Sequence, residues 1–152
     1  MIEAAEPGSE YIPDIGDVVW IDFDPQKGNE IQKRRPALVI SPHVYNRTAM
    51  NLAFICPITS TKRGSPFEIV IPEGLEVEGV ILADQAKSMD WRERKAAFIC
   101  EVPEETVRRV LRRVEALLKI LASFELDEIL GYLLGRFELE EIQESLREIL
   151  RN

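Results

Sequence analysis

The sequence predicts an α+β fold, in which a small barrel-like antiparallel sheet precedes a C-terminal helix and an added helical hairpin. Two observations lead to this prediction. Between Tyr11 and Val102, short apolar segments alternate with breaks that contain glycine and proline, a pattern typical of small β-barrels. After Pro103, apolar residues recur every three or four positions, which is the period of a helix.

Six segments of the β-rich part have the composition of strands. The expected strands are 17–23, 36–41, 52–58, 67–71, 79–84 and 97–102. A polar loop of about ten residues separates the first two, and loops longer than a hairpin requires tend to be functional. A short helical turn is expected at 44–46, directly after Pro42.

A helix is expected from Pro103 to about Leu121. Proline and two acidic residues occupy its first turn, where they suit the unpaired amides and the helix dipole. Val107, Val110 and Val114 lie on the apolar stripe that this helix would turn toward the core. We interpret the arginines between these positions as its solvated face rather than as an RNA site.

The last thirty residues read as a separate helical hairpin with one acidic face. The sequence FELDEI at 124–129 recurs as FELEEI at 137–142, while Ser123 can cap the first helix and Gly135 can end it. The chain therefore divides into three parts. These are a lead-in at 1–10, a main domain at 11–121 and an acidic helical extension at 122–152.

The charge of the chain is uneven. The net charge is −8, which argues against broad, nonspecific binding of nucleic acid. Residues 120–152 hold eight acidic side chains against three arginines, so most of this excess lies in the extension. The main domain therefore has room for a local basic cleft.

The sequence also suggests a compartment. The acidic N-terminus lacks the apolar region of a signal peptide, and no apolar run approaches the roughly 18 residues needed to span a membrane. We expect a cytoplasmic protein without membrane contact, with Cys56 and Cys100 as reduced core thiols. The single histidine, His43, excludes a two-histidine nuclease mechanism, and no residue pattern indicates a metal or cofactor site.

Arg35 is the first candidate for chemistry, because a guanidinium offers a planar fork of donors that suits phosphate and Pro36 stiffens the chain beside it. The alternative is a surface salt bridge, for example with Glu30. The second candidate is the segment 59–64, whose hydroxyls and cations follow an apolar strand and can bind phosphate. Its alternative is an ordinary polar turn.

Other residues are more ambiguous. Gln85 and Lys87 could read a base edge or could simply satisfy the edge of a sheet. We interpret Trp20 and Trp91 as core or interface aromatics rather than platforms for base stacking. His43, in a turn beside a proline, is interpreted as structural, with RNA contact as the alternative.

An ordered set of motifs in the chain resembles that of the MazF/PemK toxin endoribonucleases of bacterial toxin–antitoxin pairs. The resemblance covers about residues 11–118. Its motifs are YIPDIGD (11–17), WIDFDP (20–25), KGNE (27–30), RRPALVISP (34–42), YN (45–46), CPIT (56–59), GSPF (64–67), ADQAKS (83–88) and WR (91–92). Each motif alone is weak, whereas their shared order and spacing are highly specific.

The resemblance implies a compact SH3-like barrel of the MazF/PemK/CcdB kind, acting as a homodimer with a MazE-like antitoxin as its cognate partner. It implies sequence-specific cleavage of single-stranded RNA, including mRNA, without a metal or cofactor, leaving 2′,3′-cyclic phosphate and 5′-hydroxyl ends. Arg35 and Thr59 match the family's catalytic positions, and Glu30 is a general base or an orienter of Arg35. The expected RNA-binding residues are Lys27, Asn29, Lys33, Arg34, Ser60, Lys62, Gln85 and Lys87.

The extension departs from the family pattern, since members usually finish soon after the C-terminal helix. We interpret it as a helical appendage that packs or mediates oligomerisation. The alternative is a binding or assembly module, in which the acidic helices mask the RNA groove as an antitoxin segment would. The gyrase-poisoning relatives end in tryptophan-glycine-isoleucine, whereas this chain ends in Leu150-Arg151-Asn152, so that mechanism is not expected.

Overall fold

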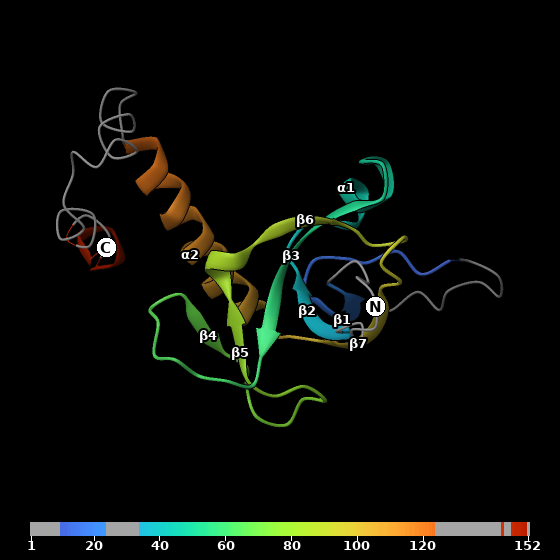
Figure 1. Cartoon of the computed structure of the whole chain (residues 1–152), viewed down its shortest axis with the longest axis horizontal. Helices are drawn as coiled ribbons and strands as arrows, with labels where there is room; N and C mark the ends of the chain where they lie inside the picture. The colour runs from blue at the N-terminus through green and yellow to red at the C-terminus, as the bar shows by residue number, and fades with distance from the viewer. Residues whose placement is uncertain (1–9, 24–33, 124–143, 145–146, 152) are drawn as a thin grey trace, which may run out of the picture.

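The computed structural model describes residues 10–23, 34–123, 144 and 147–151. Seven antiparallel strands form a curved sheet, and the long helix α2 follows them (Figure 1). The elements are β1 (Asp17–Asp22), β2 (Arg34–Val39), α1 (His43–Thr48), β3 (Leu52–Thr59), β4 (Glu68–Val70), β5 (Val80–Leu82), the 3-10 turn η1 (Ala83–Gln85), β6 (Lys87–Asp90), β7 (Ala97–Glu101) and α2 (Glu104–Ser123). The predicted α+β fold with an antiparallel sheet is confirmed.

Strand β3 is the strand that joins the two halves of the sheet. The strand order is β4-β5-β3-β2-β1-β7, and β6 also pairs with β3. One edge of β3 pairs with β2, with Ala37 opposite Pro57. Its other edge pairs first with β6 and then, at Ile58 and Thr59, with β5. The sheet can therefore curl around β3.

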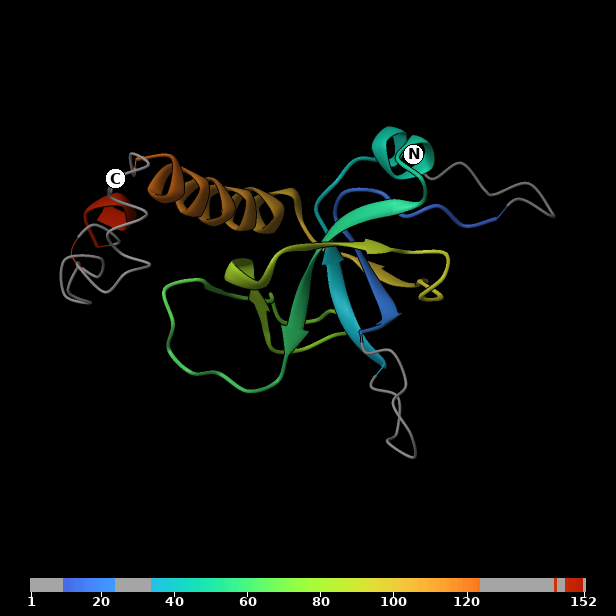
Figure 2. The ribbon, with the colours of Figure 1, turned by 45° about the horizontal axis from the view of Figure 1, so that its top comes forward.

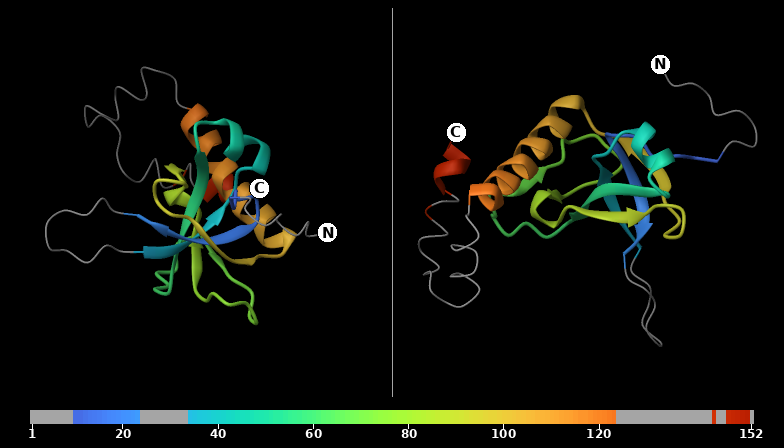
Figure 3. Two further views of the ribbon diagram at one scale, coloured as in Figure 1. Left: turned by 90° about the vertical axis from the view of Figure 1, so that its right-hand side faces the viewer. Right: turned by 90° about the horizontal axis from the view of Figure 1, so that it is seen from above.

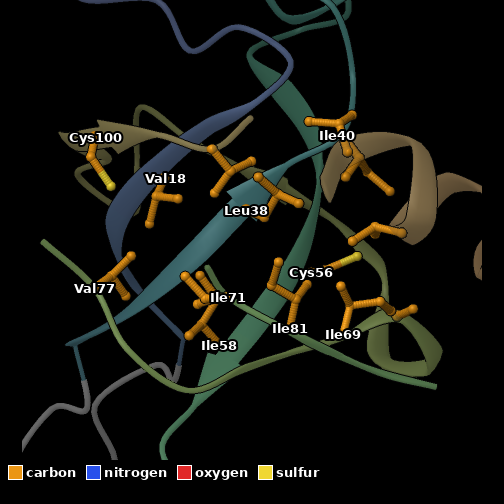
Figure 4. Packing of buried hydrophobic residues seen from close by; sticks show 14 of the residues in the cluster. Val18, Leu38, Ile40, Cys56, Ile58, Ile69, Ile71, Val77, Ile81 and Cys100 are labelled. Atoms are coloured by element: carbon orange, nitrogen blue, oxygen red, sulfur yellow. The ribbon is translucent and has the colours of Figure 1, made fainter. Parts of the chain in front are cut away.

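The two faces of the central strands bury two separate apolar clusters. Because successive side chains point to opposite faces, Val18 and Leu38 enter the first cluster while Val19 and Ala37 enter the second. Helix α2 covers the first cluster, which is seen from close by in Figure 4. Cys56 and Cys100 are buried, unbridged thiols, as the sequence predicts. The second cluster consists of Val19, Ile21, Ala37, Val39, Ala53, Ile55, Met89 and Trp91.

The observed elements differ from the predicted ones in two places. The segment expected as one strand at 79–84 ends at Leu82, and η1 follows it. Strand β6 was not predicted, because its short sequence KSMD has a single large apolar residue, Met89, and resembles a polar turn. Its pairing with β3 stabilises a strand that its composition alone does not specify.

Helix α2 continues through Ser123, whose hydroxyl donates to the carbonyl of Ile120 at 2.7 Å. Most of the predicted hairpin, at 124–143, lies outside the described residues, whereas residues 147–151 are helical. Helix α2 and this C-terminal turn lie at one end of the molecule, and the paired ends of β1 and β2 lie at the other (Figures 2 and 3). In the part of the chain described, no helix is long and apolar enough to cross a membrane.

Gly79 allows the chain to pass close to the end of β3. Its φ angle is +120°, and a Cβ atom built there would stand 2.2 Å from the carbonyl oxygen of Thr59. This oxygen belongs to backbone, so no side-chain rotation can relieve the contact. Gly74 has a similar φ of +91° but has nothing within 4 Å of its built Cβ.

These two glycines offer a matched test of the close approach. Gly74→Ala should cost about 1–2 kcal/mol of unfolding free energy because of the positive φ alone. Gly79→Ala should cost clearly more, at least about 3 kcal/mol, because β3 and the segment before β5 must move apart. Urea unfolding of both variants measures the difference. Equal losses of unfolding free energy would show that the close contact between Gly79 and the Thr59 carbonyl does not limit the residue at position 79.

Candidate active site

The register of β1, β2 and β3 brings Arg35 and Thr59 to the same end of the sheet. Arg35 pairs with Ile21 of β1, and Ala37 pairs with Pro57 of β3. The pairing of β2 with β3 ends at this last pair, and Arg35 and Thr59 each lie two residues beyond it, toward the same end of the sheet. Because paired residues share a face, both belong to the face that carries the second apolar cluster. Arg35 is exposed and Thr59 is half-buried.

The Thr59 hydroxyl has a defined orientation. Its oxygen accepts the backbone N–H of Thr61 at 3.2 Å, in the short turn that follows β3. A hydroxyl has one proton and two lone pairs, so this contact uses a lone pair and leaves the proton to be donated. Within the described residues this proton has no protein acceptor. Thr59 is thus suited to donate a hydrogen bond to an anion.

A second cation faces the same side of the sheet. Lys87 pairs with Ile55 at the start of β6, and its Nζ atom lies 5.0 Å from the centroid of the Phe23 ring. An ammonium above an aromatic face is held by the ring's negative potential while its protons stay available. Gln85 is exposed two residues earlier, in η1. Lys87 is therefore an exposed cation that the Phe23 ring helps to position.

Glu68 shapes the loop that carries the other predicted RNA contacts. Its carboxylate accepts the backbone N–H of Arg63 at 3.0 and 3.2 Å and that of Gly64 at 3.2 Å. These charge-assisted bonds tie the loop to the first residue of β4. Ser60 and Lys62 are exposed on this loop. The sequence did not single out Glu68, because an acidic residue at the start of a strand carries no signal of its own.

Arg34 has a structural role at the base of the long loop. Its Nη1 atom donates to Asp22 Oδ1 at 3.0 Å, and its Nη2 atom donates to the carbonyl of Lys95 at 2.6 Å. The Asp22 side chain is 10% exposed and that of Arg34 is 36% exposed, so this ion pair is partly shielded from water. Arg34 and Arg35 therefore point to opposite faces, and only Arg35 shares a face with Thr59.

Arg94 completes the attachment of β1. Its Nη1 atom donates to the carbonyls of Asp22 and Phe23 at 3.0 and 2.5 Å, and its own carbonyl accepts the N–H of Asp22 at 3.0 Å. Together, Arg34 and Arg94 fix the end of β1 and the start of β2 to the turn before β7. The sequence analysis did not single out Arg94, since such carbonyl contacts depend on tertiary structure.

Four predicted site residues lie outside the described part of the chain. These are Lys27, Asn29, Glu30 and Lys33. The alternative of an Arg35–Glu30 salt bridge therefore stays a prediction. Trp91 is buried and donates to the carbonyl of Asn46 at 2.9 Å, as expected for a core aromatic. Trp20, in contrast, is 44% exposed. The backbone N–H of His43 donates to the Asp14 carboxylate.

No group of three or more histidine, cysteine, aspartate or glutamate side chains with the arrangement of a metal site is found among the residues the structure describes. The prediction of a reaction without metal does not depend on this finding. The site consists instead of a guanidinium, an oriented hydroxyl and an ammonium on one face. Such a set can bind and polarise a phosphate group.

The fold is that of a known protein class. A family described as "PemK-like, MazF-like toxin of type II toxin-antitoxin system" matches residues 14–118. The endoribonuclease toxin MazF of Escherichia coli K12 is 44% identical over 111 residues, which cover 72% of this chain and 97% of that protein. The endoribonuclease toxin ChpB of the same strain is 36% identical over 110 residues, covering 68% and 92%. The chain belongs to the PemK/MazF toxin family.

Solved structures agree with this assignment. MazF from Deinococcus radiodurans is 44% identical, with a TM-score of 0.66 over 72% of this chain and 99% of that one. MazF in the MazE–MazF complex of the same organism is also 44% identical, with a TM-score of 0.69 and coverage of 72% and 98%. The predicted resemblance is confirmed. The relatives match the main domain and leave the extension uncovered.

The role of Arg94 can be separated from that of a surface cation. Arg94→Ala should lower the unfolding free energy by about 2 kcal/mol, because two carbonyls lose a charged donor. Arg92→Ala is the matched control, since Arg92 forms an exposed ion pair with Glu10 and lies over the Trp91 ring at 5.8 Å but contacts no buried carbonyl of the described residues, and its loss should change stability little. Chemical denaturation measures both. A loss for Arg92→Ala as large as that for Arg94→Ala would contradict the proposed attachment.

Proposed function

We propose that this protein is a toxin endoribonuclease that cleaves single-stranded RNA, including mRNA, at specific short sequences and so inhibits translation. The observation that carries the proposal is the shared position of Arg35 and Thr59, at neighbouring strand ends on one face of the sheet. Family membership supports it, because the relatives compared above are named endoribonucleases. The same membership supports an enzyme rather than a binding module alone.

The proposed reaction is an internal transfer at one phosphate, without metal or cofactor. The ribose 2′-oxygen forms a bond to phosphorus while the bond from phosphorus to the 5′-oxygen breaks. The 2′-hydroxyl loses its proton to a base, and the leaving 5′-oxygen gains one. The products are a 2′,3′-cyclic phosphate and a 5′-hydroxyl end.

The described residues fit this reaction through electrostatics. Negative charge builds up on the phosphoryl oxygens in the transition state, so preorganised donors supply the main stabilisation. Arg35 neutralises this charge, and the Thr59 hydroxyl donates to a nonbridging oxygen. Glu30 is proposed as the general base or as the group that orients Arg35. Arg35 as a proton shuttle would need an unusual environment, because a guanidinium does not give up its proton in ordinary surroundings.

RNA recognition is assigned to the loops around this face. Single-stranded RNA is read through splayed bases that are stacked and hydrogen-bonded. Lys87 and Gln85 lie at one side, and the loop held by Glu68 lies after Thr59. The proposed RNA-binding set remains Lys27, Asn29, Lys33, Arg34, Ser60, Lys62, Gln85 and Lys87. Within this set Arg34 binds Asp22 and Lys95, so we assign it a positioning role as well.

The proposed setting is the cytoplasm, with a homodimer as the active form and a MazE-like antitoxin as the cognate partner. The solved MazE–MazF complexes are of relatives that are 44% identical to this chain, which supports an antitoxin of that class. The alternative is a toxin fold whose RNA groove is covered by its own acidic extension. The C-terminal turn lies beside α2, away from the paired ends of β1 and β2, and this position favours an enzyme whose RNA groove is not covered.

The two central side chains give a graded prediction. Arg35→Ala should abolish RNA cleavage while leaving the fold intact, since this exposed side chain contributes nothing to either apolar cluster. Thr59→Val should slow cleavage less, by the roughly 3 kcal/mol typical of one lost transition-state donor. Cleavage of a mixed-sequence RNA measures both, and circular dichroism checks the fold. Normal cleavage by Arg35→Ala would refute the mechanism.

A further inference from the structure

A cavity of about 480 Å³ lies between α2 and β4, away from the candidate active site. Its lining combines residues from three parts of the chain. They are Glu68 and Ile69 of β4; Arg109, Arg112, Arg113, Glu115, Ala116 and Lys119 of α2; and Ile149 and Leu150 of the C-terminal turn. The cavity is therefore a junction between the main domain and the extension.

The α2 wall of this cavity is positively charged. Arg109, Arg112 and Arg113 lie along it, whereas Lys119 is paired with Glu115 at 3.2 Å. The Glu68 carboxylate is engaged with the amides of the loop after Thr59 and does not offset this charge fully. A surface of this kind favours an acidic partner.

The C-terminal turn supplies an apolar contact at the same place. Leu150 is partly buried and packs against the first apolar cluster, the one that α2 covers. Burial of a leucine side chain contributes roughly 25 cal/mol per Å² of apolar surface removed from water. Ile149 lines the cavity next to it. The last residues of the extension are thus anchored on the α2–β4 face.

From these contacts we propose that the acidic extension docks in cis on the α2–β4 face. Leu150 is its anchor, and the arginines of α2 complement its charge. Residues 120–152 carry eight acidic side chains against three arginines, which is the complementary sign. The occupant of this basic surface is therefore a segment of the same chain rather than nucleic acid.

Docking at this face keeps the anchor away from the candidate active site. The C-terminal turn and α2 lie away from the paired ends of β1 and β2 (Figures 2 and 3). Glu68 links the two places, because it lines the cavity and also holds the loop after Thr59. The extension thus acts as a brace on α2 and β4. The consequence for RNA access rests on the proposed function, whereas the docking itself does not.

Cross-linking in the full chain tests the docking directly. Ala116→Cys with Ile149→Cys places two thiols in the lining of one cavity and keeps Leu150, so a short bismaleimide should join them within a monomer. The control pairs Ile149→Cys with Leu118→Cys, because Leu118 is 61% exposed and lies two residues from Ala116, on the other side of the helix. The native thiols should contribute little, since burial raises the pKa of Cys56 to about 12 and also raises that of Cys100.

Peptide mass mapping of the monomer band gives the result. A cross-link from residue 116 to 149 that exceeds the 118–149 product at least about tenfold supports the proposal. A cross-linked dimer would show that the extension docks on a second copy, and equal products or none would also overturn docking in cis. No RNA is involved, so failure of this test leaves the proposed function unaffected.

A second measurement does not depend on the cysteine variants. Leu150→Glu should speed amide hydrogen exchange in the C-terminal half of α2 about tenfold, whereas Leu118→Glu should change it little. Both are single changes of an α-helical leucine to glutamate, so the comparison isolates the contact made by Leu150. Unchanged exchange in Leu150→Glu would contradict the bracing role.

Discussion

The pairing of β3 on both edges is the constraint on which the rest of the structure depends. On one edge, β2 fixes Ala37 opposite Pro57, and Arg35 and Thr59 each lie two residues beyond this pair, toward the same end of the sheet. On the other edge, β6 brings Lys87 to the same face, and β5 pairs with the end of β3 at Ile58 and Thr59. A slip of one residue would turn every side chain to the opposite face and separate the candidate pair.

Neighbouring arginines have different tasks because strand alternation separates them. Arg34 pairs with Asp22 and, with Arg94, fixes the strand ends, while Arg35 points to the face that carries Thr59. The fixed strand ends hold Arg35 without using its guanidinium. This division suits the proposed role of Arg35 in binding phosphate and is compatible with a local basic site on a protein whose net charge is −8.

The sequence predicted the elements whose pattern is strong and local, including β1, β2, β3, β7 and α2. It missed β6, because a four-residue polar strand is stabilised by its partner rather than by its composition. The candidate pair of Arg35 and Thr59 came from residue type and from the family resemblance. The contacts of Arg94 and Glu68 could not be predicted, since both bind backbone groups that only the folded chain brings near them.

A double-mutant cycle on RNA cleavage tests most directly whether Arg35 and Thr59 act on one phosphate. Single-turnover rates of Arg35→Lys, Thr59→Val and the double variant would be compared with that of the unchanged protein. Because both side chains stabilise the same developing charge, the double variant should lose less than the sum of the single losses, by at least about 1 kcal/mol. Losses that simply add would contradict the shared site.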